Sequence, residues 1–421
     1  MILGRADKGS EHSRVARRRV FYIPGYDPIP PRRYRELYRK EGAAQAEISG
    51  YEINLKAKQS KVGPYGWHVQ ATIEDAEVVA DVEVLVWSDI VRDSMENSIP
   101  GTYWQLARTA WTYISTGTLR RLMRLRKGPV IAALYPVGML LVQALLAALL
   151  VWGVVRALSA VAGALSLSGL LVQLGSLVFG LLAGAALMRW FKKMDGKIFA
   201  YYLMHDYAYS AASKGANSPE LEVRVAEFTA LIGTALLDDS LDEVLVVGHS
   251  SGAHVAVSVL SDLIRSGVPE DGPHLGFLSL GQVVPMVSFL PDAHRLRADL
   301  RFLSMRDELA WIDVTAPGDG CAFALCDPVS VSGVAPEGKR WPLVFSAAFT
   351  QTLSPKRWAE LRWRFFRLHF QYLCAFDQPG DYDYFRITAG PQTLRERYQD
   401  RKPSKSRIGR PVSKFTSVAA T

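Results

Sequence analysis

The stretch LVVGHSSGAH, from Leu245 to His254, contains the residues best suited to carry out chemistry. An apolar, β-branched run leads through the pattern Gly-x-Ser-x-Gly into small residues with helical spacing, which predicts a strand, a tight turn and a helix. Ser250 lies at the apex of the turn, where Gly248 and Gly252 lack the Cβ atoms that would collide across the bend. The Ser250 hydroxyl is thereby raised beyond the strand end, and the backbone N–H of Ser251 points at whatever the hydroxyl attacks.

In this strand–turn–helix setting, residues 248–252 resemble the nucleophile elbow of the α/β-hydrolase superfamily. The resemblance implies an α/β fold with a mostly parallel sheet flanked by helices, and catalytic groups on the loops after strand ends. It extends over residues 20–90 and 195–375 as an alternating pattern of strands and helices. It also implies a Ser-His-Asp mechanism in which the acid and then the base follow the serine along the chain.

The resemblance further implies a second backbone donor for the oxyanion, on a loop that follows an apolar strand upstream of the serine. The run VFYIPGYD at residues 20–27 has this form, and Gly25 and Tyr26 match the donor loop by position. Taken alone, the same run is an ordinary strand that ends in a glycine turn.

For the acid, the resemblance points to an aspartate in the turn after a later strand. Asp319 follows the strand pattern at residues 310–315, within the turn sequence APGDG, and is our candidate. Asp327 and Asp313 are the alternatives, and PGDG is also a strong turn sequence in its own right.

The base implied by this chain order is a histidine beyond the acid, and of the eight histidines only His369 lies there. Its surroundings at residues 356–373 are rich in aromatic side chains and fit one helix, whereas the base of this superfamily usually lies on a loop. A core histidine on an aromatic face is the alternative interpretation. We expect His68, on an alternating strand far upstream, to be structural.

Two long uncharged stretches, at residues 129–155 and 157–188, interrupt the alternation of strands and helices. Each exceeds the ~20 residues that cross a bilayer as a helix, and only Arg156 separates them. We therefore expect a transmembrane hairpin with spans at about residues 129–155 and 167–188. Basic clusters flank both outer ends, so the positive-inside rule places both termini and the catalytic part in the cytoplasm. A buried helical hairpin of a soluble core is the alternative.

The composition of the chain indicates in which kind of compartment the protein acts. The 421 residues carry a formal net charge of +8, and 49% of them are apolar. Three cysteines lack metal-binding spacing and leave one unpaired in any disulfide scheme, which favours a reducing compartment. The first twenty residues are basic and show no signal-peptide pattern. We expect no cofactor and no metal, because the serine mechanism that the resemblance implies requires neither. Asp377, Asp381 and Asp383 also lack the spacing of a calcium loop.

The sequence thus predicts five parts: a basic tail (1–19), the first half of a hydrolase core (20–126), the hairpin (127–194), the second half of the core (195–392) and a second basic tail (393–421). Strand patterns at residues 20–23, 51–58, 67–73, 82–87, 244–247, 275–280 and 310–315 fit one mixed sheet. An amphipathic helix is expected over residues 101–127. We expect both tails to be unstructured and close to anionic headgroups, and no nucleic-acid motif accompanies them.

Together these patterns predict a membrane-anchored serine hydrolase that cleaves acyl esters. If the strands are parallel, the anchor lies at the same sheet edge as Ser250, which favours lipids or other long-chain esters as substrates. The alternatives are an inactive hydrolase-fold scaffold that docks protein partners, and a thioesterase or acyltransferase that uses the same triad. A transporter is disfavoured, because two spans are few for a pore and no charge inside them marks a path.

Overall fold

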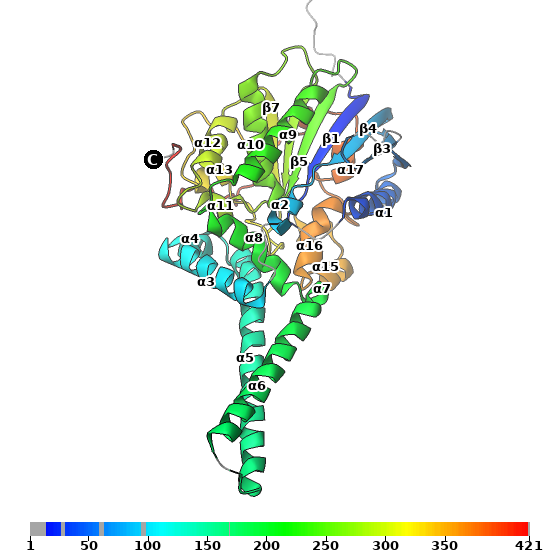
Figure 1. Cartoon of the computed structure of the whole chain (residues 1–421). Helices are drawn as coiled ribbons and strands as arrows, with labels where there is room; N and C mark the ends of the chain where they lie inside the picture. The colour runs from blue at the N-terminus through cyan, green and yellow to red at the C-terminus, as the bar shows by residue number, and fades with distance from the viewer. Residues whose placement is uncertain (1–13, 27–29, 59–62, 94–97, 168, 420–421) are drawn as a thin grey trace, which may run out of the picture.

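The computed structural model describes residues 14–26, 30–58, 63–93, 98–167 and 169–419. They form an α/β body from which one long helical hairpin projects (Figure 1). Residues 1–13 of the expected basic tail, and Asp27 of the expected oxyanion run, lie outside the described ranges.

In the described residues, eight strands form one mixed sheet in the order β2-β3-β4-β1-β5-β6-β7-β8. The strands are β1 (Arg17–Ile23), β2 (Glu52–Ala57), β3 (Gly66–Ile73), β4 (Ala76–Val84), β5 (Glu243–His249), β6 (His274–Leu280), β7 (Leu309–Thr315) and β8 (Leu343–Ser346). Only β3 runs antiparallel to its neighbours, and every other adjacent pair is parallel. The expected α/β fold with a mostly parallel sheet is confirmed. The strand β8 was not predicted, and β4 begins and ends earlier than the predicted run 82–87.

The helices cover both faces of the sheet and its carboxyl edge. They are α1 (Pro31–Ser49), α2 (Ser88–Asp93), α3 (Ile99–Ser115), α4 (Thr118–Leu125), α5 (Lys127–Ala164), α6 (Leu170–Lys193), α7 (Asp195–Ile198), α8 (Ala200–Ala212), α9 (Pro219–Ala235), α10 (Gly252–Ser266), α11 (Val284–Ser288), α12 (His294–Leu303), α13 (Pro328–Val331), α14 (Phe349–Thr352), α15 (Pro355–Leu361), α16 (Phe365–His369), the 3₁₀ turn η1 (Phe370–Leu373), α17 (Tyr384–Ala389) and α18 (Leu394–Arg397).

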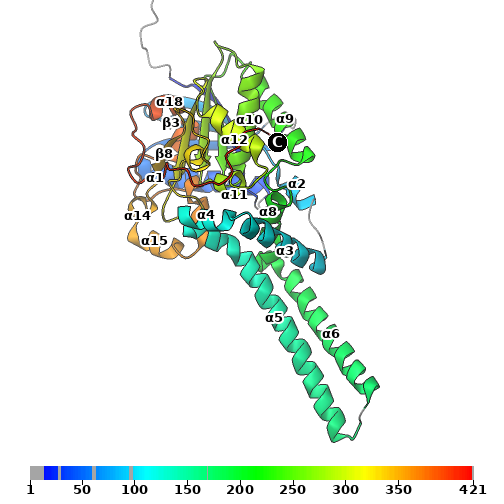
Figure 2. The same cartoon turned by 90° about the vertical axis from the view of Figure 1, so that its left-hand side faces the viewer.

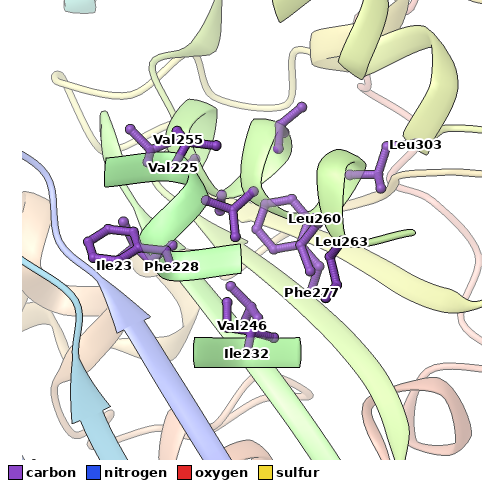
Figure 3. Close-up of a cluster of buried hydrophobic side chains, with 14 of the residues drawn as sticks. Ile23, Val225, Phe228, Ile232, Val246, Val255, Leu260, Leu263, Phe277 and Leu303 are labelled. Carbon is purple, nitrogen blue, oxygen red and sulfur yellow. The ribbon is translucent and has the colours of Figure 1, made fainter. Parts of the chain in front are cut away.

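The central strand β5 is buried on both faces, as its continuous apolar sequence predicts. Val244 and Val246 point to one face, where α9, α10 and α12 pack against the sheet (Figure 3). Leu245 and Val247 point to the other face, which α1, α17 and η1 cover. Because neighbouring parallel strands end at the same edge, the loops after β1, β5, β6 and β7 converge there.

The hairpin consists of α5 and α6, both long and apolar enough to cross a membrane. Only 17% of the most apolar window of each helix is buried, whereas a core helix of a soluble protein is mostly buried. The two helices pack where Gly180 and Gly184 of α6 meet Val151 of α5. The first helix is longer than the predicted span, because α5 continues through Arg156 to Ala164 and the chain turns only after it. Arg156 therefore lies inside a helix and not between two spans.

Two other expected helices are broken. The predicted helix 101–127 is divided into α3 and α4 at Gly117, which adopts a left-handed conformation with φ of 73°. The predicted helix 356–373 consists of α15, α16 and η1, so His369 ends a short helix and is followed by a tighter turn.

The expectation of unstructured tails is wrong for the described residues. Arg17 to Arg19 form the start of β1, and Arg18 is buried beside Glu243 with 2.5 Å between Nε and Oε2. Residues 393–419 form α18 and then run along the body, where Ile408 pairs with Cys326 and the carbonyl of Val412 accepts a hydrogen bond from Arg121. Long-range backbone bonds hold this segment, which composition alone does not predict.

Candidate active site

Ser250 follows β5 in a strained turn at the carboxyl edge of the sheet. Its φ is 56°, a left-handed conformation that costs a non-glycine residue of order 1–3 kcal/mol. The turn is fixed from two sides, because the N–H of Ser250 donates to the carbonyl of Leu280 and the Ser250 carbonyl accepts from Ala253. The serine is therefore presented by a rigid connection between β5 and α10.

Glycines allow neighbouring backbones to approach this turn. A Cβ on Gly252 would lie 2.2 Å from the carbonyl oxygen of Ile23, and one on Gly248 would lie 2.8 Å from Cα of Ala253. The loop after β1 is equally close, since a Cβ on Gly25 would lie 2.8 Å from Cβ of Ser250. The adjacency of β1 and β5 thus brings the predicted oxyanion loop against the serine.

Asp319 and His369 are joined by a buried hydrogen bond of 2.7 Å between Oδ2 and Nδ1. The same carboxylate oxygen accepts the hydroxyl of Tyr372 at 3.0 Å, and Oδ1 accepts the N–H of Cys321 at 2.8 Å. Burial and the nearby Asp319 raise the pKa of Tyr372 well above its usual value, so its hydroxyl stays a donor. The aspartate is held by three donors and in turn fixes the imidazole ring.

The two alternative acids have other partners. Asp327 caps α13 through the N–H groups of Val329 and Ser330 and pairs with Lys339 at 2.8 Å. Asp313 lies within β7, where it accepts the Ser279 hydroxyl at 2.6 Å, and burial raises its pKa to about 8. Of the three candidates, Asp319 is the one that contacts His369.

His369 and Ser250 line the same cavity, of about 320 Å³. Nε2 of His369 is buried and has no hydrogen-bond partner in the described part of the chain. No hydrogen bond joins it to Ser250 among the described residues. Such bonds between a base and a nucleophile often tighten only when substrate is bound.

His249, directly before the serine, packs on His369 with ring centroids 4.8 Å apart. Its Nε2 lies 3.1 Å from the backbone carbonyl of His369, to which it donates as the neutral tautomer protonated at Nε2. Burial and the adjacent His369 lower the pKa of His249 to about 3, so the ring stays uncharged near neutral pH. His249 therefore orients His369 without adding charge to the site.

Gly25 and Ser251 line the cavity together with Ser250. Within the described ranges, the N–H groups of Ser251 and Gly25 donate no hydrogen bond. The N–H of Tyr26 differs, because it donates to the Ser251 hydroxyl at 2.9 Å. Of the two residues expected to supply the second oxyanion donor, Gly25 has the free group and Tyr26 anchors the loop.

Part of the cavity wall comes from helices at the root of the hairpin. Pro129 and Ala132 belong to the first turns of α5, Tyr202 to α8 and Phe366 to α16. Strand β4 is parallel to β1 and β5, so the chain leaves it for the hairpin at the same edge that carries Ser250. The hairpin root and the serine therefore share one cavity, whose lining is largely aromatic and aliphatic.

Asp319, Cys321 and His369 form a group whose ligand atoms lie within 4.8 Å of one another, which tests the expectation of no metal. The donor set fits a metal poorly. Burial and the nearby Asp319 raise the pKa of the Cys321 thiol well above its usual value, which disfavours the thiolate that a metal needs. The Asp319–His369 hydrogen bond also occupies one nitrogen and one oxygen of the set.

Sequence reasoning missed the supporting residues Tyr372 and His249 and the cavity residues from α3, α5 and α8. Tyr372 lies three positions after His369, which is a spacing that could have indicated a shared partner. The cavity residues of α3, α5 and α8 could not be recognised from the sequence, because their apolar side chains also fit a membrane helix or a core.

Comparisons with protein-family models, with curated proteins and with solved structures gave no match to this chain.

Proposed function

We propose that this protein is a membrane-anchored serine hydrolase of the α/β-hydrolase type that cleaves acyl esters. One observation carries the proposal: the Asp319–His369 hydrogen bond leaves Nε2 of His369 unpaired in the cavity that Ser250 also lines. A serine hydroxyl is a weak nucleophile and needs a base that is oriented by a third group. In the proposed site, His369 is the base and Asp319 is the group that orients it.

In the proposed reaction, Nε2 of His369 takes the proton from Ser250 as the oxygen attacks the acyl carbonyl. Asp319 keeps the ring in the tautomer protonated at Nδ1 and stabilises the imidazolium. The N–H groups of Ser251 and Gly25 hold the oxyanion, each worth about 3 kcal/mol in the transition state. The protonated His369 then gives its proton to the leaving alcohol, and water attacks the acyl-enzyme to release the acid.

The cavity supports an apolar acyl group as the preferred substrate part. Tyr113, Phe199 and Phe370 add to its lining beside the α5 residues. The exposed apolar hairpin supports a membrane anchor, and the basic clusters on its outer flanks support a cytoplasmic body. A long-chain ester within the bilayer would then lie next to the active site.

A fluorophosphonate probe tests the proposal on the full-length protein in detergent or in vesicles. We expect the probe to label the wild-type chain and Ser266→Ala, a control serine at the end of α10 that lies outside the cavity. Ser250→Ala should lose the label. Hydrolysis of nitrophenyl esters should depend on Ser250 and rise in kcat/KM with acyl length. A correctly folded wild-type chain that takes no label and cleaves no ester would leave a docking scaffold as the better interpretation.

A further inference from the structure

The end of the body from which the hairpin projects exposes two sets of side chains that are rich in aromatic residues. On α3, Trp104, Trp111 and Ile114 form an exposed stripe, and Trp111 is 73% exposed. The second set lies in residues 362–367, the sequence RWRFFR, in which all six residues are exposed. In both views, α3 and α15 lie at this end, beside the root of the hairpin (Figures 1 and 2). We call these two sets of residues the collar.

The exposed stripe of α3 is apolar, whereas the exposed face of a surface helix in a soluble protein is usually polar. The other face of α3, with Thr102, Thr109 and Tyr113, is buried against the body. A soluble helix would then turn polar residues outward, whereas α3 presents two tryptophans and an isoleucine. Such side chains are more stable in an apolar or interfacial environment than in bulk water.

Direct contacts place both parts of the collar at the level where the hairpin leaves the body. The hydroxyl of Tyr103, next to Trp104, donates to the carbonyl of Leu140 in α5 at 2.7 Å. The ring of Phe366 contacts the ring of Tyr135 in α5, with centroids 6.4 Å apart. Beyond this level α5 has Arg156 as its only charged residue.

The second helix of the hairpin, α6, has its basic end at the level where α5 contacts the collar. Gly184 of α6 packs on Val151 of α5, so Arg189, Lys192 and Lys193 lie back toward Leu140. Trp190, at this end of α6, is also more than half exposed. Tryptophan and basic residues at the end of an apolar span are typical of a membrane–water interface.

The charge of the collar indicates the chemistry of its partner. Arg108 is exposed on α3 between Trp104 and Trp111, and Arg362, Arg364 and Arg367 lie among the aromatic residues of the other set. None of these four arginines pairs with a carboxylate in the parts of the chain that the structure describes. Residues 99–127 and 361–376 contain no Asp or Glu. Unpaired arginines between exposed aromatic rings fit anionic headgroups above an acyl layer.

We infer that the collar docks on the anionic surface of the bilayer that the hairpin crosses, and that the cavity opens to acyl esters from this surface. Phe366 links the two functions, because it belongs to the collar and also lines the cavity with Ser250. Docking therefore seats the cavity beside the headgroups, and substrate enters from the lipid and not from water. The inference rests on the proposed membrane anchor, and its substrate part on the proposed hydrolase activity.

The position of the collar is tested with environment-sensitive fluorophores on introduced cysteines in the full-length protein. Trp111→Cys and Trp363→Cys carry the probe, and Leu237→Cys, at a site 71% exposed and remote from the hairpin, is the matched control. The chain without an introduced cysteine gives the background from Cys321, Cys326 and Cys374. The protein is reconstituted in vesicles of phosphatidylcholine with and without phosphatidylserine.

We expect collar probes to be blue-shifted and quenched by spin-labelled lipid but not by aqueous iodide, and the control probe to show the reverse. Arg362→Gln combined with Arg364→Gln should weaken the effect of phosphatidylserine. Collar probes that iodide quenches as strongly as the control would overturn the inference, and a protein partner would then be the better explanation of the collar. This result does not depend on catalysis.

A second measurement tests substrate access. Trp111→Ser combined with Trp363→Ser should lower hydrolysis of a long-chain ester presented in vesicles at least tenfold, and leave hydrolysis of a short soluble ester unchanged. Leu237→Ser should change neither rate. An equal loss on both esters, or no loss on either, would overturn access from the bilayer. Absence of any Ser250-dependent hydrolysis would instead refute the proposed function and leave the probe result standing.

Discussion

A methyl group on Gly281 would lie 3.0 Å from Cε1 of His369, so the chain after β6 directly supports the imidazole ring. The same methyl group would lie 2.7 Å from Cε2 of Tyr372, which donates to Asp319. Gly281 has a φ of 53°, and its N–H donates to the carbonyl of Val314 at the end of β7. The orientation of His369 is therefore set by backbone that the sheet holds in place.

Gly281→Ala is expected to displace His369 and lower kcat about 10–100-fold, because small misplacements of a catalytic group have effects of this size. Gly50→Ala is the matched control, since Gly50 also has a left-handed φ, of 71°, but a Cβ there meets nothing within 4 Å. Both variants should lose about 1 kcal/mol of stability from backbone strain. Equal activity in the two variants, measured on a soluble ester, would contradict this role of Gly281.

Substitutions of Asp319 and Asp327 should have different effects, the first on activity and the second on stability. Asp319→Asn should lower kcat about 10³–10⁴-fold with little change in Tm, because an amide cannot fix the required tautomer of His369. Asp327→Asn should retain kcat and lose about 1–3 kcal/mol of stability, because Lys339 loses its charged partner. Steady-state kinetics and thermal unfolding in detergent decide the assignment. An Asp327→Asn chain that folds but is inactive would exchange the two roles.

Removing the Tyr372 hydroxyl tests its support of Asp319. Tyr372→Phe deletes the donor to Oδ2 of Asp319 and the acceptor for the N–H of Ala316. We expect kcat to fall about 3–30-fold and stability to fall by about 1–3 kcal/mol, because the Ala316 N–H is left buried without a partner. Tyr382→Phe, which removes another buried hydroxyl that donates to the Tyr372 carbonyl, is the control and should lower stability alone.

Acid should destabilise the fold through His254. Burial lowers the pKa of His254 from 6.5 to about 4, so below pH 6.5 the unfolded chain binds a proton that the folded chain does not. The free energy of unfolding therefore falls as the pH drops from 6.5 toward 4, by up to about 3 kcal/mol. His254→Gln should show a shallower fall of Tm with acid than the wild type, whereas His274→Gln, at an exposed site, should follow the wild type. Parallel curves for all three chains would refute this assignment.

Close packing of the hairpin depends on Gly184. A Cβ at this position would lie 2.6 Å from Cγ2 of Val151, whereas one on Gly175 of the same helix meets nothing within 4 Å. Gly184→Leu should separate α5 from α6 and lower Tm in detergent, and Gly175→Leu should not. Crosslinking between cysteines introduced on the two helices would report the separation. Unchanged crosslinking in Gly184→Leu would show that these helices do not depend on this contact.

Sequence patterns within a few neighbouring residues were enough to predict several elements of the fold. The apolar run before Ser250 and the small residues after it specify β5, the turn and α10, because each depends on neighbours within a few positions. The absence of charge over two long stretches likewise predicted α5 and α6. The same reasoning failed where one residue interrupts a pattern. The predicted first span ends before Arg156, but α5 continues past it, and the predicted helix 101–127 is interrupted where Gly117 lies between α3 and α4.

The sequence by itself determined the turn between β5 and α10, most strands of the sheet and the two long apolar helices, since these follow from spacing along the chain. Only the tertiary structure decided that Asp319, and not Asp327, contacts His369, and that Tyr26 gives its N–H to Ser251. Tyr26 and Ser251 lie 225 positions apart, and strand order alone makes them neighbours. The collar also depends on this order, because exposure of a tryptophan is set by what the rest of the fold leaves uncovered.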